Sequence, residues 1–380
     1  MYCELFSTLT IAMSAQEVPE ELWLEIFKLI PRECLMKASL TFRAFYRITR
    51  PLIFTHFHFH PYCLIQSAYG GVLLLPRKEK IALARERLDF WSSGEIGPYV
   101  RSCDITPWRA HSTRALAVSK TPHVLLHAFF DRLTHFTELR RVSTNEVYFS
   151  QTAVTNICAL SALTHLNIHG LRVPRDGVIS PMPQALAVSS FTIHHNRPLK
   201  NDVSYWITLL RPDSLLELDI HCDLRIFGEN LDNIPSFPRV YKLSVNFGAM
   251  PQNLAVLAKF PGVQRLKVLK SGKLGDFIRD VNLLPALTEY VGPHESLAIF
   301  LPCPNLTRLT IYRCNLDDFL MRLQNVRGPL NITSVNLDLC YLDDQKLSAL
   351  FAVLPQLMEL CIRTTVYADP EGIPVLQSAR

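Results

Sequence analysis

Three histidines that alternate along one short segment are the residues best suited to binding a metal. His56, His58 and His60 are separated by phenylalanines, so on a strand all three lie on the same face. Imidazole nitrogens are common ligands of zinc. Neighbouring same-face residues of a strand lie about 7 Å apart, which is too far for one small ion. We therefore expect a solvated strand face that begins the folded array, and no metal site.

Basic side chains form a second candidate site. Six of them fall on neighbouring strands of the repeat described below, at positions that point to solvent. They are Lys242, Arg265, Lys267, Lys270, Arg308 and Arg313. An acidic or phosphorylated segment of a target protein is the natural ligand for such a patch. The alternative is a set of solvated charges that keeps a strand face soluble.

Three further histidines, His169, His194 and His221, occupy equivalent positions of three successive repeats. Stacked on neighbouring strands about 4.8 Å apart, they form a polar or pH-sensitive contact strip for the same target protein. The alternative is that they are unrelated surface residues.

No catalytic motif accompanies these residues. The sequence contains no GxSxG, HExxH, Walker loop or GxGxxG, so we predict neither enzymatic activity nor a cofactor. The 380 residues carry a formal charge of +5 without a dense basic block, which does not indicate nucleic-acid binding. No segment stays apolar over the roughly 18 residues that span a bilayer, and the first residues lack the basic start of a signal peptide. Ten cysteines occur singly, as expected of reduced thiols in an intracellular protein, whether cytoplasmic, nuclear or both.

The elements that must position the candidate residues follow from an internal repeat. The pattern apolar-x-x-apolar-x-apolar places its last two apolar residues on one face of a strand. Eleven copies, three of them weaker, begin at positions 100, 139, 163, 188, 215, 240, 263, 287, 306, 332 and 357. Nine of the ten intervals lie between 19 and 27 residues, near the period of leucine-rich repeats, and one of 39 marks an insertion. The predicted fold is an α/β leucine-rich-repeat solenoid, with parallel strands on the concave face and helices or irregular segments on the convex face.

Two adjacent copies resemble the cysteine-containing class of leucine-rich repeats. Leu306 to Asp318 and Ile332 to Asp344 carry Cys, Leu and Asp-Asp at matching positions. The resemblance implies that Cys314 and Cys340 fill the inward corner after each strand, and have no catalytic or metal-binding role. The Asp pairs fall where helix N-caps belong, which predicts helices over 319–325 and 345–354.

The first fifty residues do not follow the repeat. Acidic residues directly after Pro19, with apolar residues along one side, predict a helix that ends at Pro31. Two more short helices are predicted over about 32–39 and 40–49, the second ending before Pro51. Helices this short bury little by themselves, so we expect them to need a partner surface.

These helices carry a motif that resembles an F-box. The matching residues are Val18-Pro19, Glu21-Leu22, Leu24-Glu25-Ile26-Phe27, Ile30-Pro31, Leu35 and Leu40-Thr41-Phe42-Arg43-Ala44-Phe45. The departures from the family pattern are Val18 and Ile30 for Leu, Thr41 for Val, Phe42 for Cys and Phe45 for Trp. Four of these five keep an apolar side chain, so the interface chemistry is retained, although the larger Phe42 shifts local packing.

The resemblance implies a role as the substrate-recognition subunit of an SCF-type ubiquitin ligase. F-box proteins bind a Skp-type adaptor and through it a cullin–RING complex, while a C-terminal repeat domain holds a target protein. Carried onto this sequence, the adaptor-facing residues are Pro19, Leu22, Leu24, Ile26, Phe27, Leu35, Leu40 and Phe45. About half of them must also pack the helices against one another. The alternative is a leucine-rich-repeat scaffold whose N-terminal helices only cap the array, with no ligase role.

The expected domains are an F-box over 17–60, a linker helix and cap over 61–99, and the repeats over 100–368. Within the linker, Ile81, Ala84, Leu88 and Trp91 share one face of a helix predicted to start at Arg77.

Overall fold

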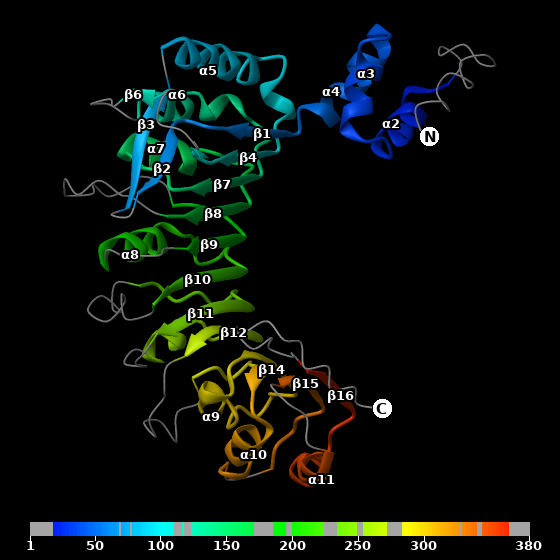
Figure 1. Ribbon diagram of the computed structural model, residues 1–380, viewed down its shortest axis with the longest axis vertical. Coiled ribbons are helices and arrows are strands. Elements are labelled where there is room, and N and C mark those ends of the chain that lie inside the picture. The colour runs from blue at the N-terminus through cyan, green and yellow to red at the C-terminus, as the bar shows by residue number, and fades with distance from the viewer. Residues whose placement is uncertain are drawn as a thin grey trace. The chain divides into compact units, whose positions relative to one another are not determined.

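The computed structural model divides the chain into two compact units, Met1–Leu163 and Thr164–Arg380 (Figure 1). The structure describes residues 18–67, 70–76, 78–109, 116–117, 123–170, 185–194, 200–223, 234–248, 254–271, 283–326, 329–339 and 344–364.

The described part of the first unit begins with three short helices, α2 (Glu20–Lys28), α3 (Arg32–Ser39) and α4 (Arg43–Ile53). Pro19 and Pro31 lie directly before α2 and α3 with φ of −55°, close to the angle that the proline ring fixes. The third helix differs from the prediction, because it begins at Arg43 and continues past Pro51. Pro51 has no backbone N–H to donate. The last turn of the helix is closed by the backbone N–H of Phe54, which donates to the Arg50 carbonyl oxygen at 3.0 Å.

Three strands of the first unit, β1 (His56–Phe59), β4 (Ser102–Ile105) and β7 (Arg141–Asn145), pair in parallel in that order. The strand expected at the three histidines is therefore the first rung of the sheet, and the repeats begin well before the expected boundary at residue 100. Its apolar pattern, Phe54-x-x-Phe57-x-Phe59, is a further copy that the sequence comparison missed. Phe57 and Phe59 are both buried, as the pattern requires.

The segment between β1 and β4 contains more than the predicted linker helix. A smaller sheet, which the sequence analysis did not predict, has the order β5-β2-β3-β6 and is made of β2 (Cys63–Ser67), β3 (Gly70–Pro76), β5 (Trp108–Arg109) and β6 (Leu116–Ala117). The linker helix α5 (Lys78–Trp91) is present, and Leu88 and Trp91 of its predicted apolar face are buried. Trp91 stacks on Phe57, with ring centroids 4.7 Å apart.

Helical segments also connect the strands of the first unit. They are η1 (Gly97–Tyr99), α6 (Val124–Asp131), η3 (Leu133–His135) and α7 (Gln151–Cys158). The start of α7 is capped by Ser150, whose hydroxyl oxygen accepts from the backbone N–H of Ala153 at 3.2 Å.

Within the described residues of the second unit, nine parallel strands follow one another in chain order. They are β8 (His165–His169), β9 (Ser190–His194), β10 (Glu217–Asp223), β11 (Lys242–Gly248), β12 (Arg265–Ser271), β13 (Glu289–Gly292), β14 (Arg308–Cys314), β15 (Ser334–Leu339) and β16 (Glu359–Thr364). Each strand begins two residues after the start of a copy of the apolar pattern, so these nine predicted rungs are confirmed.

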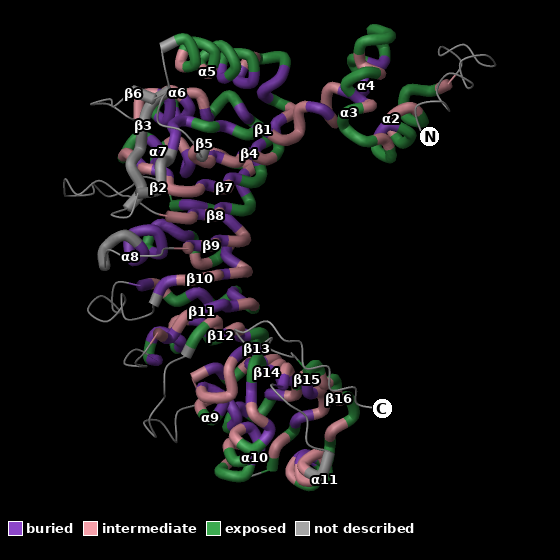
Figure 2. Tube along the Cα trace, in the orientation of Figure 1, coloured by how far each residue is buried: buried purple, intermediate pink, exposed green. Residues whose placement is uncertain are grey.

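Along the first residues of the strands of the second unit, equivalent repeat positions lie opposite one another, and the register shifts only toward the ends of β10–β11, β11–β12 and β14–β15. Leu243, for example, pairs with Leu218 on one side and with Leu266 on the other. The apolar residues of the pattern are buried in β8 to β15 and half-buried in the last strand, β16 (Figure 2). Most residues between them are partly or fully exposed, and the exceptions are Ser244 and Val291, which are buried. One face of each strand therefore supplies the core, and the opposite face is available to a ligand.

The segments that follow these strands are helical or irregular. They include α8 (Lys200–Leu209), η6 (Leu254–Lys259), η7 (His294–Ser296), α9 (Leu297–Phe300), α10 (Leu316–Gln324) and α11 (Asp344–Val353). The two predicted helices after Cys314 and Cys340 correspond to α10 and α11. The cap of α10 differs from the prediction, because Asn315 Oδ1 accepts from the Asp317 N–H at 3.0 Å, ahead of the Asp pair. Cys314 is buried as expected, whereas Cys340 lies outside the described residues.

Parallel strands that mostly recur at intervals near the period of leucine-rich repeats, each joined to the next by a connecting segment, make this a leucine-rich-repeat fold. Within the part of the chain that the structure describes, no helix has the length and apolar character to cross a membrane.

Candidate functional site

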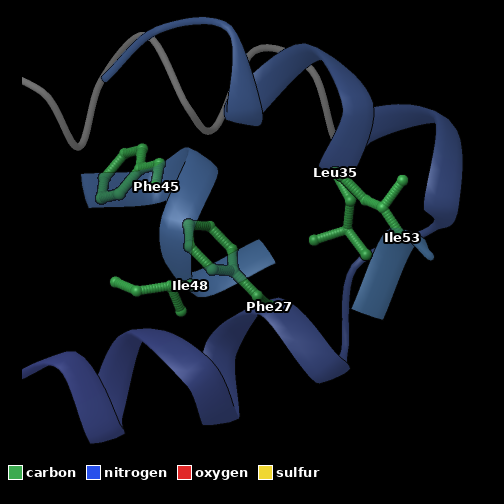
Figure 3. Packing of buried hydrophobic residues seen from close by; sticks show 5 residues of the cluster. All are labelled: Phe27, Leu35, Phe45, Ile48 and Ile53. Atoms are coloured by element: carbon green, nitrogen blue, oxygen red, sulfur yellow. The ribbon is translucent and has the colours of Figure 1, made fainter. Parts of the chain in front are cut away.

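The three N-terminal helices contain a small hydrophobic core of their own. Its buried members are Phe27, Leu35, Phe45, Ile48 and Ile53 (Figure 3). Phe27 and Phe45 meet edge to face with ring centroids 5.1 Å apart, while Leu35 and Ile53 lie together at the other end of the cluster. Because α2, α3 and α4 have only 9, 8 and 11 residues, they depend on one another for burial.

Part of the adaptor-facing set lies in this core. Phe27, Leu35 and Phe45 are at most 8% exposed and pack the helices against one another, which is the second role expected of about half of the set. Leu24 is half-buried and packs against the same cluster. The other members of the set are all exposed: Pro19, Leu22, Ile26 and Leu40.

Helix α2 has a second apolar stripe that the core does not use. Leu22, Ile26 and Leu29 follow the i, i+4, i+7 spacing of one helix face, and all three are exposed. Leu29 and Leu40 are 87% and 86% exposed. Other large apolar side chains exposed on α3, α4 and the turn between them are Met36, Phe42 and Tyr46. Sequence reasoning missed Leu29, Met36 and Tyr46, although the spacing of Leu29 from Leu22 indicated its face.

The solvent-facing side of the second unit brings several predicted target-binding residues together. The pairing of β10 to β14 aligns one column of side chains, in the order Glu217, Lys242, Arg265, Glu289 and Arg308. Lys242 Nζ lies 3.1 Å from Glu217 Oε2, and Arg265 Nη2 lies 3.3 Å from Glu289 Oε1. The predicted basic patch is therefore a ladder of mixed signs, because two acidic residues of the same column pair with two of its three cations.

The ladder changes the acidity of Glu217. Burial by itself raises the pKa of this carboxyl, but hydrogen bonds from Lys242 and Tyr241 outweigh it and hold the pKa below its usual value. Glu217 is therefore ionised at neutral pH and offsets the charge of Lys242.

The remaining basic residues lie outside these two pairs. Lys267 is half-buried in the next column, between Ser244 and Val291, and Lys270 is exposed beside Asn246. Arg313 is exposed near the end of β14 with a φ of 48°. Arg308 is exposed and lines a shallow depression.

That depression lies over the last four strands and has a volume of about 550 Å³. It is lined by Glu289, Arg308, Leu309, Thr310, Ser334, Val335, Asn336, Met358, Glu359, Leu360 and Cys361. Met358 is 84% exposed, and it offers an apolar contact beside charged side chains of both signs. Sequence reasoning did not select Met358, because it precedes its strand and falls in none of the aligned columns.

The three histidines at equivalent repeat positions do stack on β8, β9 and β10. The ring centroids of His169 and His194 are 4.9 Å apart, and those of His194 and His221 are 4.7 Å apart. His221 Nε2 lies 3.0 Å from Asp219 Oδ1. Burial, together with His194 and His221, lowers the pKa of His169, although Asp219 acts in the opposite direction.

The alternating histidines of β1 lie closer together than expected. His56 and His58 have ring centroids 4.1 Å apart, because long side chains converge even where their Cα atoms are far apart. Asp104 of β4 lies beside these two histidines, because His58 pairs with Asp104 in the sheet. The expectation that the side chains are too far apart to bind one metal ion is therefore wrong. Burial lowers the pKa of His58, and His56 acts in the same direction, while Asp104 opposes them. His60 instead lies 2.8 Å, through Nδ1, from the Thr106 carbonyl oxygen.

Comparisons with known proteins find distant structural likeness. No protein-family model and no curated protein sequence matches the chain. Among solved structures, an internalin from Listeria monocytogenes is 12% identical, with 73% of this chain and 84% of that chain covered and a TM-score of 0.33. No functional conclusion follows from that likeness.

Proposed function

We propose that this protein is a substrate receptor of an SCF-type cullin–RING ubiquitin ligase. In this proposal, helices α2–α4 bind a Skp-type adaptor and the leucine-rich repeats bind the protein to be ubiquitylated. The receptor itself performs no catalysis, since the linked ligase subunits carry out the chemistry.

The observation that carries the proposal is the exposed apolar surface of the three helices. Their own core is complete without Leu22, Ile26, Leu29 and Leu40, which nevertheless face solvent. Fully burying one leucine side chain is worth about 1.5–3 kcal/mol, so leaving several exposed is costly unless a partner covers them. Leu22, Ile26 and Leu40 also occupy positions of the F-box resemblance that are assigned to the adaptor.

The target protein is assigned to the solvent-facing side of the second unit. The depression beside Arg308 and Met358 combines an apolar contact with charged groups, as protein interfaces do. Arg265, Lys267 and Arg308 favour an acidic or phosphorylated segment, although Glu289 reduces the net positive charge of that surface.

A second candidate is a leucine-rich-repeat interaction scaffold without a ligase role. It is favoured by the repeat fold, which by itself is sufficient for binding another protein.

Binding to a purified Skp-type adaptor separates the two candidates. The full chain is expected to bind, and the double change Leu22→Ala and Leu40→Ala is expected to weaken binding roughly 30- to 1000-fold, from about 1–2 kcal/mol per contact. Both side chains are exposed, so their truncation leaves the helix core intact. Leu24 is unsuitable for this test because it packs against that core.

The matched control is Met321→Ala, which truncates an exposed apolar side chain on α10 and should leave adaptor binding unchanged. Absence of binding by folded wild-type protein contradicts the ligase proposal and favours the scaffold.

A further inference from the structure

The first two strands of the sheet bring together side chains that are suited to binding a metal. His56 and His58 of β1 point to the same side as Ser102 and Asp104 of β4, because His56 pairs with Ser102 and His58 with Asp104. The opposite side of both strands is apolar and buried, with Phe57 packed beside Cys103 in the same register. The cluster therefore lies on the polar face of a rigid, paired backbone.

The distances within this cluster match those between ligands of one small ion. His56 Nε2 lies 3.1 Å from Asp104 Oδ2, and His58 Nδ1 lies 3.4 Å from the same oxygen. Two ligands at about 2.0–2.1 Å from a tetrahedral zinc ion are roughly 3.3 Å apart. One ligand atom from each of the three residues lies within 4.8 Å of the others, so only a small movement of the two imidazoles completes the set.

A second group orients one of the histidines. His56 Nδ1 is hydrogen-bonded to the Ser102 hydroxyl, which leaves Nε2 directed at Asp104. Histidines that bind metals usually hold their second ring nitrogen in such a contact, because it fixes the tautomer and the ring plane. His60 does not join the set, since its Nδ1 lies 2.8 Å from a backbone carbonyl oxygen.

We propose that His56, His58 and Asp104 form a zinc-binding site with an open fourth position. Two imidazoles and one carboxylate suit Zn²⁺, whereas Ca²⁺ and Mg²⁺ prefer oxygen ligands throughout. The side chains of His56, His58 and Asp104 are 36%, 49% and 33% exposed, so an ion reaches the site from solvent. Water, or a ligand from a bound protein, takes the fourth position. The ion joins β1 to β4 through side chains, beside the end of α4.

The test uses the full chain, freed of metal by chelation and kept in a reductant that does not bind metals. Titration with Zn²⁺ is expected to fill one site that raises the melting temperature, and Co²⁺ is expected to give a tetrahedral visible spectrum without thiolate charge transfer. Mg²⁺ and Ca²⁺ should produce neither effect. The absence of thiolate bands separates this site from adventitious binding by cysteines.

Three variants test the assignment. Asp104→Asn keeps the shape of the side chain and should weaken Zn²⁺ binding by at least tenfold, as should His58→Ala. Ser102→Ala tests the positioning role and should weaken binding by about 10- to 100-fold while leaving the tetrahedral spectrum in place.

The matched control is His60→Ala, which removes the third alternating histidine and should leave the zinc affinity unchanged. A wild-type protein that does not bind Zn²⁺, or variants at Asp104 and His58 that bind it as tightly as wild type, would overturn the proposal. Either result would mean that the cluster is only a set of surface hydrogen bonds and ion pairs.

Discussion

Replacing Phe27 by alanine should unfold the three N-terminal helices without disturbing the repeats. Phe27 is completely buried in α2 and contacts Phe45 edge to face at 5.1 Å and Trp23 at 5.6 Å, measured between ring centroids. Leu29, two residues further along, is 87% exposed. The pair Phe27→Ala and Leu29→Ala therefore compares an internal and an external apolar side chain at the end of one helix.

The expected loss of stability is large for Phe27→Ala. Removing a buried phenylalanine costs about 3–5 kcal/mol, and the contacts with two other aromatic rings favour the upper part of that range. Each 1.4 kcal/mol is about tenfold in an equilibrium constant, so the opening equilibrium of these helices rises by roughly 100- to 4000-fold. Leu29→Ala should change stability by about 0.5 kcal/mol or less, because the side chain leaves no cavity.

Hydrogen–deuterium exchange followed by mass spectrometry measures this difference locally. Peptides covering residues 20–53 should lose protection in Phe27→Ala and keep it in Leu29→Ala, while peptides from β8 to β16 stay unchanged in both. Equal protection of the helices in the two variants would refute the assignment of Phe27 to an internal core. Global loss of protection in Phe27→Ala would refute the independence of the helices from the repeats.

Three other predictions concern the repeats. Arg265→Glu should weaken binding of a fluorescent phosphoserine peptide several-fold in anisotropy titrations. It should change the free energy of unfolding by less than about 1 kcal/mol, because the ion pair of Arg265 with Glu289 is half-exposed. An unchanged peptide affinity would mean that the ladder is only solvated surface. Folding holds the pKa of His169 below 6.5, the usual value of a histidine. The contribution of this group to the free energy of unfolding is therefore present above that pH and is lost as pH falls through the lowered pKa. In NMR titrations His194→Gln should raise the pKa of His169, and no change would exclude coupling between the rings. Gly262→Ala should lower the melting temperature through a cost of about 1–3 kcal/mol, because its Cβ would collide with the carbonyl oxygen of Pro238. Gly94→Ala meets nothing within 4 Å and serves as the control, and equal melting temperatures of the two variants would contradict the close approach at Gly262.

The rungs of the second unit were predictable because their signal is repeated. A single apolar pattern fits any half-buried strand, but nine copies at similar intervals predict both the strands and the columns of side chains between them. The same logic would have found β1 from Phe54, Phe57 and Phe59. The antiparallel pair β2 and β3 has no counterpart among the described residues of the other repeats, so comparison within the chain could not predict it.

The sites were only partly predictable, since the columns are visible in the sequence but the side-chain contacts are not. The alignment of Lys242, Arg265 and Arg308 followed from the repeat, whereas the pairing of Arg265 with Glu289 depends on side-chain conformations. Asp104 was missed for another reason. It meets His58 through the register of β1 with β4, and the copy of the apolar pattern at Phe54 that sets this register was not recognised in the sequence.

The first residues of neighbouring strands in the second unit stay in register, so two kinds of evolutionary change can act on this surface independently. The intervals between successive strands vary, with Arg265 to Glu289 longer than Glu289 to Arg308, yet both pairs lie side by side in register. An insertion or deletion in a connecting segment therefore leaves each exposed column aligned. A point substitution in a column changes one contact without moving its neighbours. The ligand preference of this surface can thus drift one residue at a time, while the length of the chain varies independently.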